Sequence, residues 1–154
     1  MGYSMKQGES MKINSGFKIC EGSKYVDGEF MRIGHGFHIK FENSVVVSVQ
    51  FGYVHYRTGC DLEFEGKNGF SPLEGVPDAE VAIFIDDNRV SGEQGVFITR
   101  LCLECRNALV DDAVAGWVKP DRIPEILKWA RDHSGTLTPE EKKAIHDEKD
   151  ALSF

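Results

Sequence analysis

The sequence predicts an α+β fold, in which a small antiparallel β-sheet is followed by C-terminal helices. Two observations carry this prediction. From Gly36 to Gly52 apolar and polar residues alternate, which is the period of half-buried strands. After Lys119 the apolar residues recur at helical spacing instead, so the end of the chain is expected to be helical.

The stretch 36–52 is interpreted as a β-hairpin around a turn at residues 42–44. Asn43 supports the turn because asparagine tolerates a left-handed backbone. One face of the hairpin is expected to be buried, and a single hairpin needs further strands or a helix to cover that face. The residues assigned to the buried face are Phe37, Ile39, Phe41, Val47, Val49 and Phe51.

At 154 residues the chain is long enough for one core, and three segments are expected. Residues 1–30 form an N-terminal extension, residues 31–135 a compact sheet-plus-helix domain, and residues 136–154 a C-terminal helix. Within the extension, an alternation at 13–19 leaves an edge strand open as an alternative. Residues 61–78 are rich in glycine and are interpreted as a long loop.

Further strands are expected at 79–85 and 114–118. The apolar stretch 96–103 fits either a strand or the start of a helix, and its periodicity does not decide between them.

Two helix starts follow. Asp121 is expected to be an N-cap with Pro124 in the first turn, and Gly135 to end that helix. Thr138 and Glu141 have the spacing of a capping box, which predicts the start of a second helix.

The formal net charge of −7 argues against a general nucleic-acid binder, since phosphate contacts need a basic face. No apolar run is long enough to span a bilayer, so no membrane partner is expected. The first ten residues lack the apolar core of a secretory signal, which predicts a cytoplasmic location with reduced thiols.

Cys102 and Cys105 form a CxxC pair, while the other two cysteines stand alone. A zinc site or a redox role would need a second pair or a suitable βαβ context, so plain thiols are expected, with no metal and no cofactor. The sequence also lacks a nucleophile elbow, a zinc-protease helix and a phosphate loop. These observations predict a protein that is not an enzyme.

An aromatic and basic set of residues is the candidate ligand site. Aromatic rings stack on a nucleobase, and arginine binds phosphate through paired hydrogen bonds. The alternative is that each arginine pairs with one of the many carboxylates. Arg57 is expected to be exposed, so that its replacement by alanine weakens binding and leaves folding nearly unchanged. The assigned residues are Tyr53, His55, Tyr56, Arg57, Arg89, Arg100 and Arg106.

Four short stretches resemble a pattern found in small proteins of phages and prophages. They are Gly36–Asn43, Val47–Gly52, Ala79–Ala82 and Gly116–Asp121, and the resemblance covers about residues 31–133. The chain departs from the pattern where Ser44 follows the asparagine in place of a glycine. It departs again where residues 53–56 replace a glycine-rich loop.

The general build is also similar to the Thoeris anti-defence sponges of phages. That resemblance implies a homo-oligomer in the host cytoplasm that sequesters a small nucleotide-derived immune signal without cleaving it. The alternative function is a protein-interaction module that docks on a host or phage protein through its sheet edge or its last helix. An enzyme using His55 or the CxxC pair is the third hypothesis.

Overall fold

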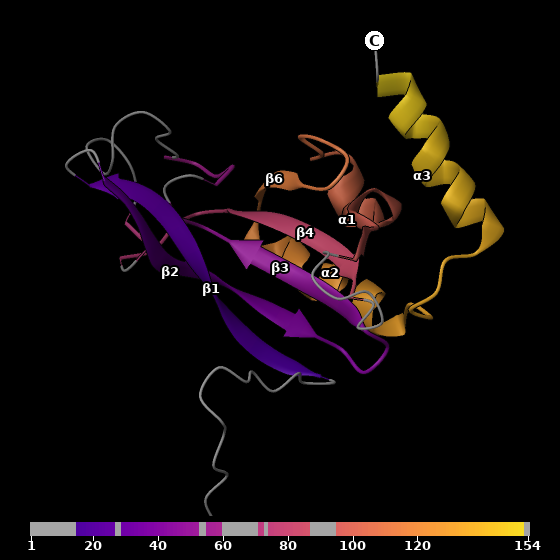
Figure 1. The fold of residues 1–154 in the computed structure, drawn as a ribbon, viewed down its shortest axis with the longest axis horizontal. Coiled ribbons are helices and arrows are strands. Elements are labelled where there is room, and N and C mark those ends of the chain that lie inside the picture. The colour runs from indigo at the N-terminus through magenta and orange to yellow at the C-terminus, as the bar shows by residue number, and fades with distance from the viewer. Residues whose placement is uncertain are drawn as a thin grey trace, which may run out of the picture.

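The computed structural model describes residues 15–26, 29–52, 55–59, 71–72, 74–86 and 95–152. In this part of the chain, six strands form one antiparallel sheet, and the longer helices follow it, which confirms the α+β prediction (Figure 1). The strands are β1 (Gly16–Val26), β2 (Glu29–Lys40), β3 (Val45–Gln50), β4 (Ala79–Ile85), β5 (Val96–Phe97) and β6 (Ala115–Val118). The helices are α1 (Leu103–Arg106), α2 (Ile123–Asp132) and α3 (Pro139–Leu152), with 3-10 turns η1 (Thr99–Leu101) and η2 (Pro120–Arg122).

Strands β1 to β4 lie side by side in chain order, each antiparallel to the next. The far edge of β4 is shared by two short strands. β5 pairs with the end of β4 at Phe84 and Ile85, and β6 pairs with its beginning at Ala79 and Val81. This arrangement brings the loop before β4 and the loop before α2 to the same end of the sheet.

The predicted hairpin is present, and its register agrees with the alternation of the sequence. Phe37 pairs with Val49 and Ile39 with Val47, so the assigned apolar residues share one face. Val47 and Val49 are buried, while Phe37 and Phe41 are partly buried against the same core.

The turn of the hairpin is joined to the end of α2. The left-handed residue is Ser44, with a φ of 71°, and not Asn43. The Asn43 side-chain amide instead donates to the carbonyl oxygens of Ala130 at 2.8 Å and His133 at 2.6 Å. Gly135 comes so close that an added Cβ would lie 2.1 Å from the carbonyl oxygen of Asn43, and its φ is +79°.

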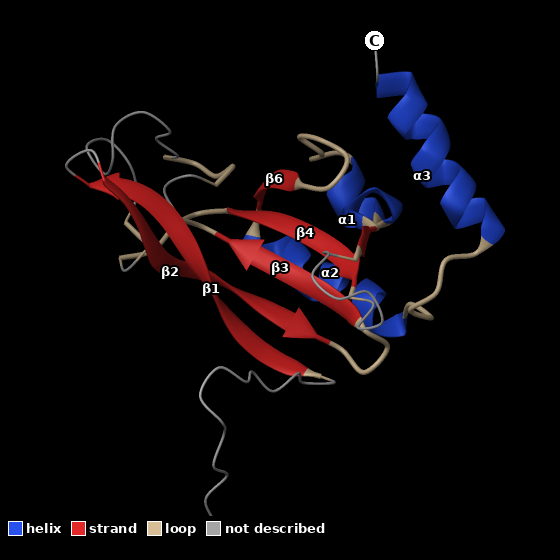
Figure 2. Ribbon diagram, viewed as in Figure 1, coloured by secondary structure: helices blue, strands red, loops and turns tan. Residues whose placement is uncertain are grey.

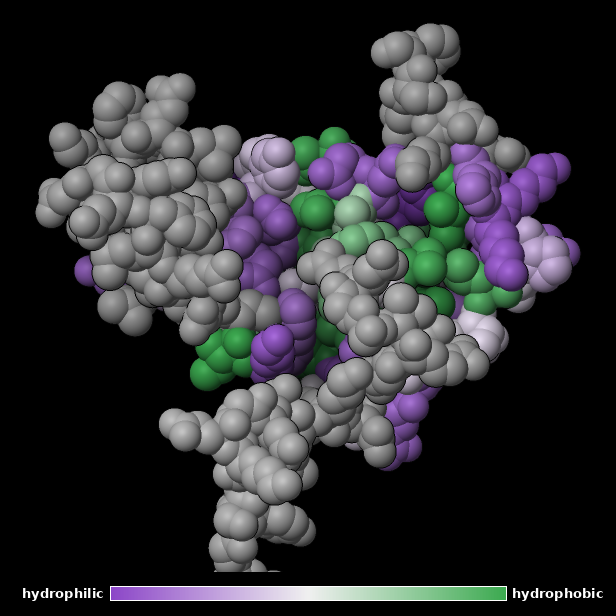
Figure 3. All heavy atoms as spheres, in the orientation of Figure 1, coloured by the Kyte–Doolittle hydropathy of each residue, from purple (hydrophilic) through white to green (hydrophobic). Residues whose placement is uncertain are grey.

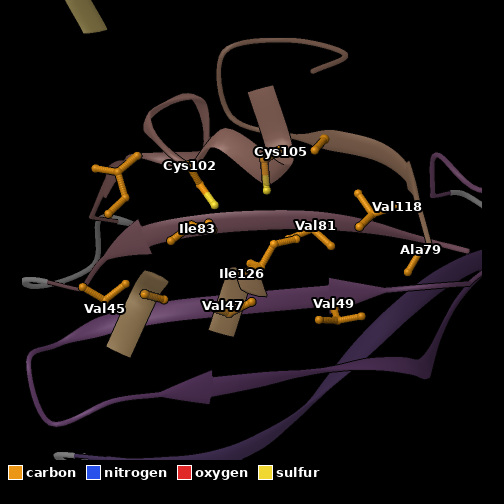
Figure 4. Close-up of a cluster of buried hydrophobic side chains, with 13 residues drawn as sticks. Val45, Val47, Val49, Ala79, Val81, Ile83, Cys102, Cys105, Val118 and Ile126 are labelled. Carbon is orange, nitrogen blue, oxygen red and sulfur yellow. The ribbon is translucent and has the colours of Figure 1, made fainter. Parts of the chain in front are cut away.

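The core lies between the sheet and α2 (Figure 4). Val47 of β3, Ile83 of β4 and Ile126 of α2 have no exposed surface. Cys102 and Cys105 are also buried in this cluster, on the side where α1 packs near β4.

The sheet begins earlier than the sequence suggested. β1 lies within the segment assigned to an N-terminal extension, yet it pairs with β2 from Gly16 opposite Lys40 to Val26 opposite Glu29. The proposed boundary between residues 30 and 31 therefore falls inside a strand, β2. The open alternative of an edge strand near 13–19 describes this region better, because β1 has β2 as its one neighbour in the described sheet.

Three later expectations can also be compared with the structure. The ambiguous stretch 96–103 holds the two-residue β5 and then η1, with α1 beginning at its last residue. The N-cap assignment of Asp121 is wrong, because Asp121 lies within η2 and α2 continues directly from it. The capping box is confirmed: the N–H of Thr138 donates to Glu141 at 3.0 Å, and the N–H of Glu141 donates to Thr138 at 3.1 Å.

Figure 2 shows α2 behind β3 and β4 and α1 beside β6, while α3 stands apart and β1 and β2 form the edge of the sheet far from it. On the face shown in Figure 3, hydrophobic and hydrophilic side chains are intermixed. None of the described helices combines the length and the apolar composition needed to cross a bilayer.

Candidate functional site

The predicted aromatic and basic set is only partly brought together. Tyr53 and Arg89 lie outside the described residues. His55, Tyr56 and Arg57 share the loop after β3, whereas Arg100 lies in η1 and Arg106 in α1. None of these five side chains lines the three grooves considered below.

Arg57 is buried, with a relative exposure of 1%, and the expectation of an exposed side chain was wrong. Its Nε donates to the carbonyl oxygens of Phe51 at 2.7 Å and Gly52 at 3.0 Å, and its Nη1 donates to that of Thr58 at 2.8 Å. A guanidinium used in this way joins residues 51–52 to residues 57–58.

Arg100 is buried as well and has a carboxylate partner. Its guanidinium forms an ion pair with Asp112 and donates to the carbonyl oxygen of Ile145 at 3.4 Å. It therefore joins η1 to the loop before β6 and to α3. Arg106 is exposed on α1. Arg100 therefore follows the alternative left open by the sequence, in which an arginine pairs with a carboxylate.

His55 serves the same loop. Its Nδ1 accepts a hydrogen bond from the N–H of Gly52 at 3.0 Å. Burial, together with the neighbouring charges of His35 and Arg57, lowers the pKa of His55 to about 4. The imidazole is therefore neutral near pH 7 and acts as an acceptor within the loop.

The loop is fixed to the beginning of β4 by two carboxylates. The N–H of Tyr56 donates to Glu80 at 2.8 Å, and the N–H of Thr58 donates to Asp78 at 2.6 Å. Thr58 also donates from its hydroxyl to Asp78 at 2.5 Å. These contacts hold Tyr56 next to β6, where its ring centroid lies 5.8 Å from that of Trp117.

Trp117 is presented by a bulge in β6. Ala79 pairs with Val118 and Val81 with Ala115, so two residues of β6 stand opposite Glu80 alone. Trp117 has a φ of 53°, which costs an ordinary side chain about 1–3 kcal/mol and is retained only where surrounding contacts fix it. Bulges commonly redirect a side chain next to a functional site.

Hydrogen bonds and close packing supply those contacts. The N–H of Trp117 donates to the carbonyl oxygen of Tyr56 at 2.9 Å, and the N–H of Gly116 donates to that of Ala108 at 2.9 Å. A Cβ at Gly116 would lie 2.9 Å from the Cβ of Tyr56, so glycine is needed for this approach. As a result the Trp117 ring is half exposed, at 50%.

We name the hollow beside this ring the Trp117 groove. It has a volume of about 410 Å³ and lies between α1, β6 and η2. Two cations stand at its rim: Lys119 lies 3.4 Å from Asp78, and Arg122 lies 2.8 Å from Glu104. Both cationic side chains are 64% exposed. The lining residues are Leu103, Glu104, Asn107, Ala108, Trp117, Val118, Lys119 and Arg122.

Two other grooves have a different chemistry. The larger of them, of about 560 Å³, lies near Trp129 and His133 and is lined by Lys128 and by four carboxylates, from Glu104, Glu125, Asp132 and Glu141. An anionic ligand would be repelled there. The third, of about 380 Å³, lies at β1 and is almost entirely apolar.

The CxxC pair contributes to the core. Both thiols are free and buried, and within the described ranges no third histidine, cysteine or carboxylate joins them in a cluster able to hold a metal ion.

Sequence reasoning did not assign Trp117 to the site. The signal was a large aromatic residue at an outward position of a short strand, between Gly116 and Val118. The bulge that displays it depends on pairing with β4, which is distant in the sequence.

Comparison of the chain with protein-family models, with curated proteins and with solved structures found no match.

Proposed function

We propose that this protein is a non-enzymatic binder that holds a small nucleotide-type ligand in the Trp117 groove. The observation that carries the proposal is the half-exposed indole, presented on a strained bulge beside two exposed cations. The groove volume of about 410 Å³ lies within the usual range for small-molecule sites.

Each part of such a ligand has a counterpart in the groove. An indole face stacks on a nucleobase, which typically contributes about 1–3 kcal/mol. Lys119 and Arg122 are the groups that would bind a phosphate, and the Asn107 amide offers donors and an acceptor to the polar edge of a base. Tyr56, one of the residues predicted from the sequence, packs beside the indole, with 5.8 Å between the ring centroids.

Charge limits the kind of ligand. Arg122 is paired with Glu104, and Lys119 lies near Asp78, so the two cations are balanced by two carboxylates. Asp78 is held in place by Thr58, so a phosphate must share Lys119 with it. At Arg122 a phosphate must instead displace Glu104. Because Glu104 competes with the phosphate there, Glu104→Gln should increase the affinity for an anionic nucleotide.

The groove favours binding without chemistry. None of its eight described lining residues is a serine, threonine, cysteine or histidine, and its one carboxylate, from Glu104, is paired with Arg122. Sequestration of an intact ligand agrees with this composition. That the ligand is a nucleotide-derived immune signal, as the resemblance to anti-defence sponges implies, stays a prediction.

The test is calorimetric titration with a panel of nucleotides, after any ligand carried from the cells has been released by heat and identified by mass. Trp117→Gly is the informative variant because glycine suits a φ of 53° while the stacking ring is removed. Affinity should fall by about five- to 150-fold, from the loss of about 1–3 kcal/mol of stacking, without loss of stability. The matched control is Trp129→Phe, outside the groove, and equal affinity of wild type and Trp117→Gly would refute the site.

One observation favours a second candidate, a protein-interaction module. Phe17 and Ile19 of β1 are strongly exposed, at a free edge of the described sheet. A nucleotide panel that yields no binding and no thermal shift would favour this candidate over the first.

A further inference from the structure

The apolar surface at β1 is incomplete in a single copy of the chain. Phe17 is 80% exposed and Ile19 75% exposed, and both occur on the edge strand. Phe17 pairs with Ile39, and together with Phe41 these side chains form the wall of the third groove. We call this region, Phe17, Ile19 and the groove beside them, the β1-edge surface.

The backbone of β1 is incomplete in the same way. β1 runs for 11 residues and uses one edge to pair with β2, so its other edge has no partner within the described sheet. Proteins usually protect a long edge with proline, charge or a covering element. β1 contains no proline, and the one charge near its beginning is Lys18, which stands between the exposed Phe17 and Ile19. Its pairing with β2 is irregular only farther along, at Cys20 and Glu21. Over residues 16–19 an apolar strip therefore coincides with an edge that has no partner in the described sheet.

We propose that β1 pairs antiparallel with β1 of a second copy of this chain, across a twofold axis, to form one continuous sheet. A second copy offers the two things that this edge needs. Its own β1 has an unpaired edge to complete the strand pairing, and its own Phe17 and Ile19 can cover the apolar strip. Interfaces across a twofold axis are self-complementary in this sense.

The side chains select the position of the axis. An axis at Lys18 would set two lysines directly opposite each other, which is unfavourable in a strand pair. An axis at Ile19 sets Ile19 against its own counterpart and Lys18 opposite position 20 instead. The two Phe17 rings then flank the central isoleucine pair. We therefore assign the axis to Ile19.

Cationic side chains lie near this surface. Lys128 and Arg131 of α2 line the same groove as Phe17. Their repulsion of the same residues in the second copy is reduced by salt. The strand pairing and the apolar contacts must outweigh what remains of it.

The first test is the mass of the wild-type protein in solution, by light scattering and sedimentation across a dilution series without nucleotide. A dimer is expected. The double variant Phe17→Lys with Ile19→Lys should be monomeric with an unchanged circular dichroism spectrum. The control is Val96→Lys, at a position on β5 that is 51% exposed, which should remain dimeric. A monomeric wild type, or a dimer that survives the double variant, would overturn the proposal.

The second test measures the register. Ile19→Cys, in a background carrying Cys20→Ser and Cys60→Ser, should form a covalent dimer on mild oxidation, because residues opposite each other have Cβ atoms about 4.5–5.5 Å apart. Val96→Cys in the same background is the matched control and should stay uncrosslinked. Equal crosslinking at both positions would refute the assigned axis. Both tests are independent of the Trp117 groove, so their failure leaves the proposed ligand binding unaffected.

Discussion

The two halves of the sheet differ in how far their apolar side chains are buried. In the half formed by β3 and β4, Val47 and Ile83 have no exposed surface. In the half formed by β1 and β2, Phe17 and Ile19 are 80% and 75% exposed on the edge strand. α2 has ten residues, about 15 Å of helix, and it packs on β3. Burial therefore depends on which strands the covering helix packs on, and not on apolar side chains alone.

Truncation of an isoleucine in each half should give the largest contrast. Ile83→Ala removes a fully buried side chain and should lower the free energy of unfolding by about 2–5 kcal/mol. Ile19→Ala should change it by less than about 0.5 kcal/mol in dilute protein, because the side chain is exposed in one copy. Urea unfolding of both variants measures the difference, and equal losses would contradict the division of the sheet.

The covered half also contains a buried cation, which gives the next largest effect. Arg57→Ala leaves the carbonyl oxygens of Phe51, Gly52 and Thr58 without this donor. The loss should be at least about 1.5–3 kcal/mol, the scale of one hydrogen bond to a charged group. Arg106→Ala, at an exposed position, is the control and should change stability by less than about 0.5 kcal/mol. If Arg57→Ala melts at the wild-type temperature, the loop does not depend on this side chain.

The elements with strong periodicity were predictable from the sequence. Alternation located the hairpin and the strand at 79–85, and the Thr138 capping box located the start of α3. β1 was assigned to an extension because its glycine and serine residues obscure the alternation. Its place in the sheet depends on pairing with β2.

The candidate site was less predictable, for a physical reason. An arginine on a ligand and an arginine bonded to nearby carbonyl oxygens have the same sequence signature, and Arg57 is of the second kind. The exposure of Trp117 depends on a bulge, and the bulge depends on pairing between β6 and β4. Contacts between segments far apart in the chain decide both cases.

Asn43 lies where the hairpin meets the covering helix, and its replacement should have an intermediate effect. Asn43→Ala removes the donors to the last carbonyl oxygens of α2 and should cost about 1–3 kcal/mol. Asn43→Asp should cost more than Asn43→Ala, because a carboxylate would face those carbonyl oxygens and the negative end of the helix dipole. Thermal unfolding of both variants at neutral pH measures the order. The reverse order would show that α2 is not held by this side chain.

The smallest effects are expected from two carboxylates at the start of β4, whose pKa values move in opposite directions. Burial raises the pKa of Asp78, but hydrogen bonds from the Thr58 hydroxyl and N–H, together with Lys119, outweigh it and hold the pKa below 3.8. Burial raises the pKa of Glu80 above 4.5; the hydrogen bond from the Tyr56 N–H opposes it by a smaller amount, and Asp111 adds a still smaller increase.

These opposite directions predict opposite dependences of stability on pH. Because the folded pKa of Asp78 is depressed, its stabilisation is present above 3.8 and is lost as the pH falls below that value. Because the folded pKa of Glu80 is raised, the folded state takes up a proton more readily than the unfolded state. Stability is therefore gained as the pH falls toward 4.5. Asp78→Asn should remove the loss on acidification, and Glu80→Gln should remove the gain. Urea unfolding from about pH 7 to about pH 3 measures both slopes. If the two variants change the slope in the same direction, the two carboxylates do not have the opposed environments that fix the Tyr56 loop to β4.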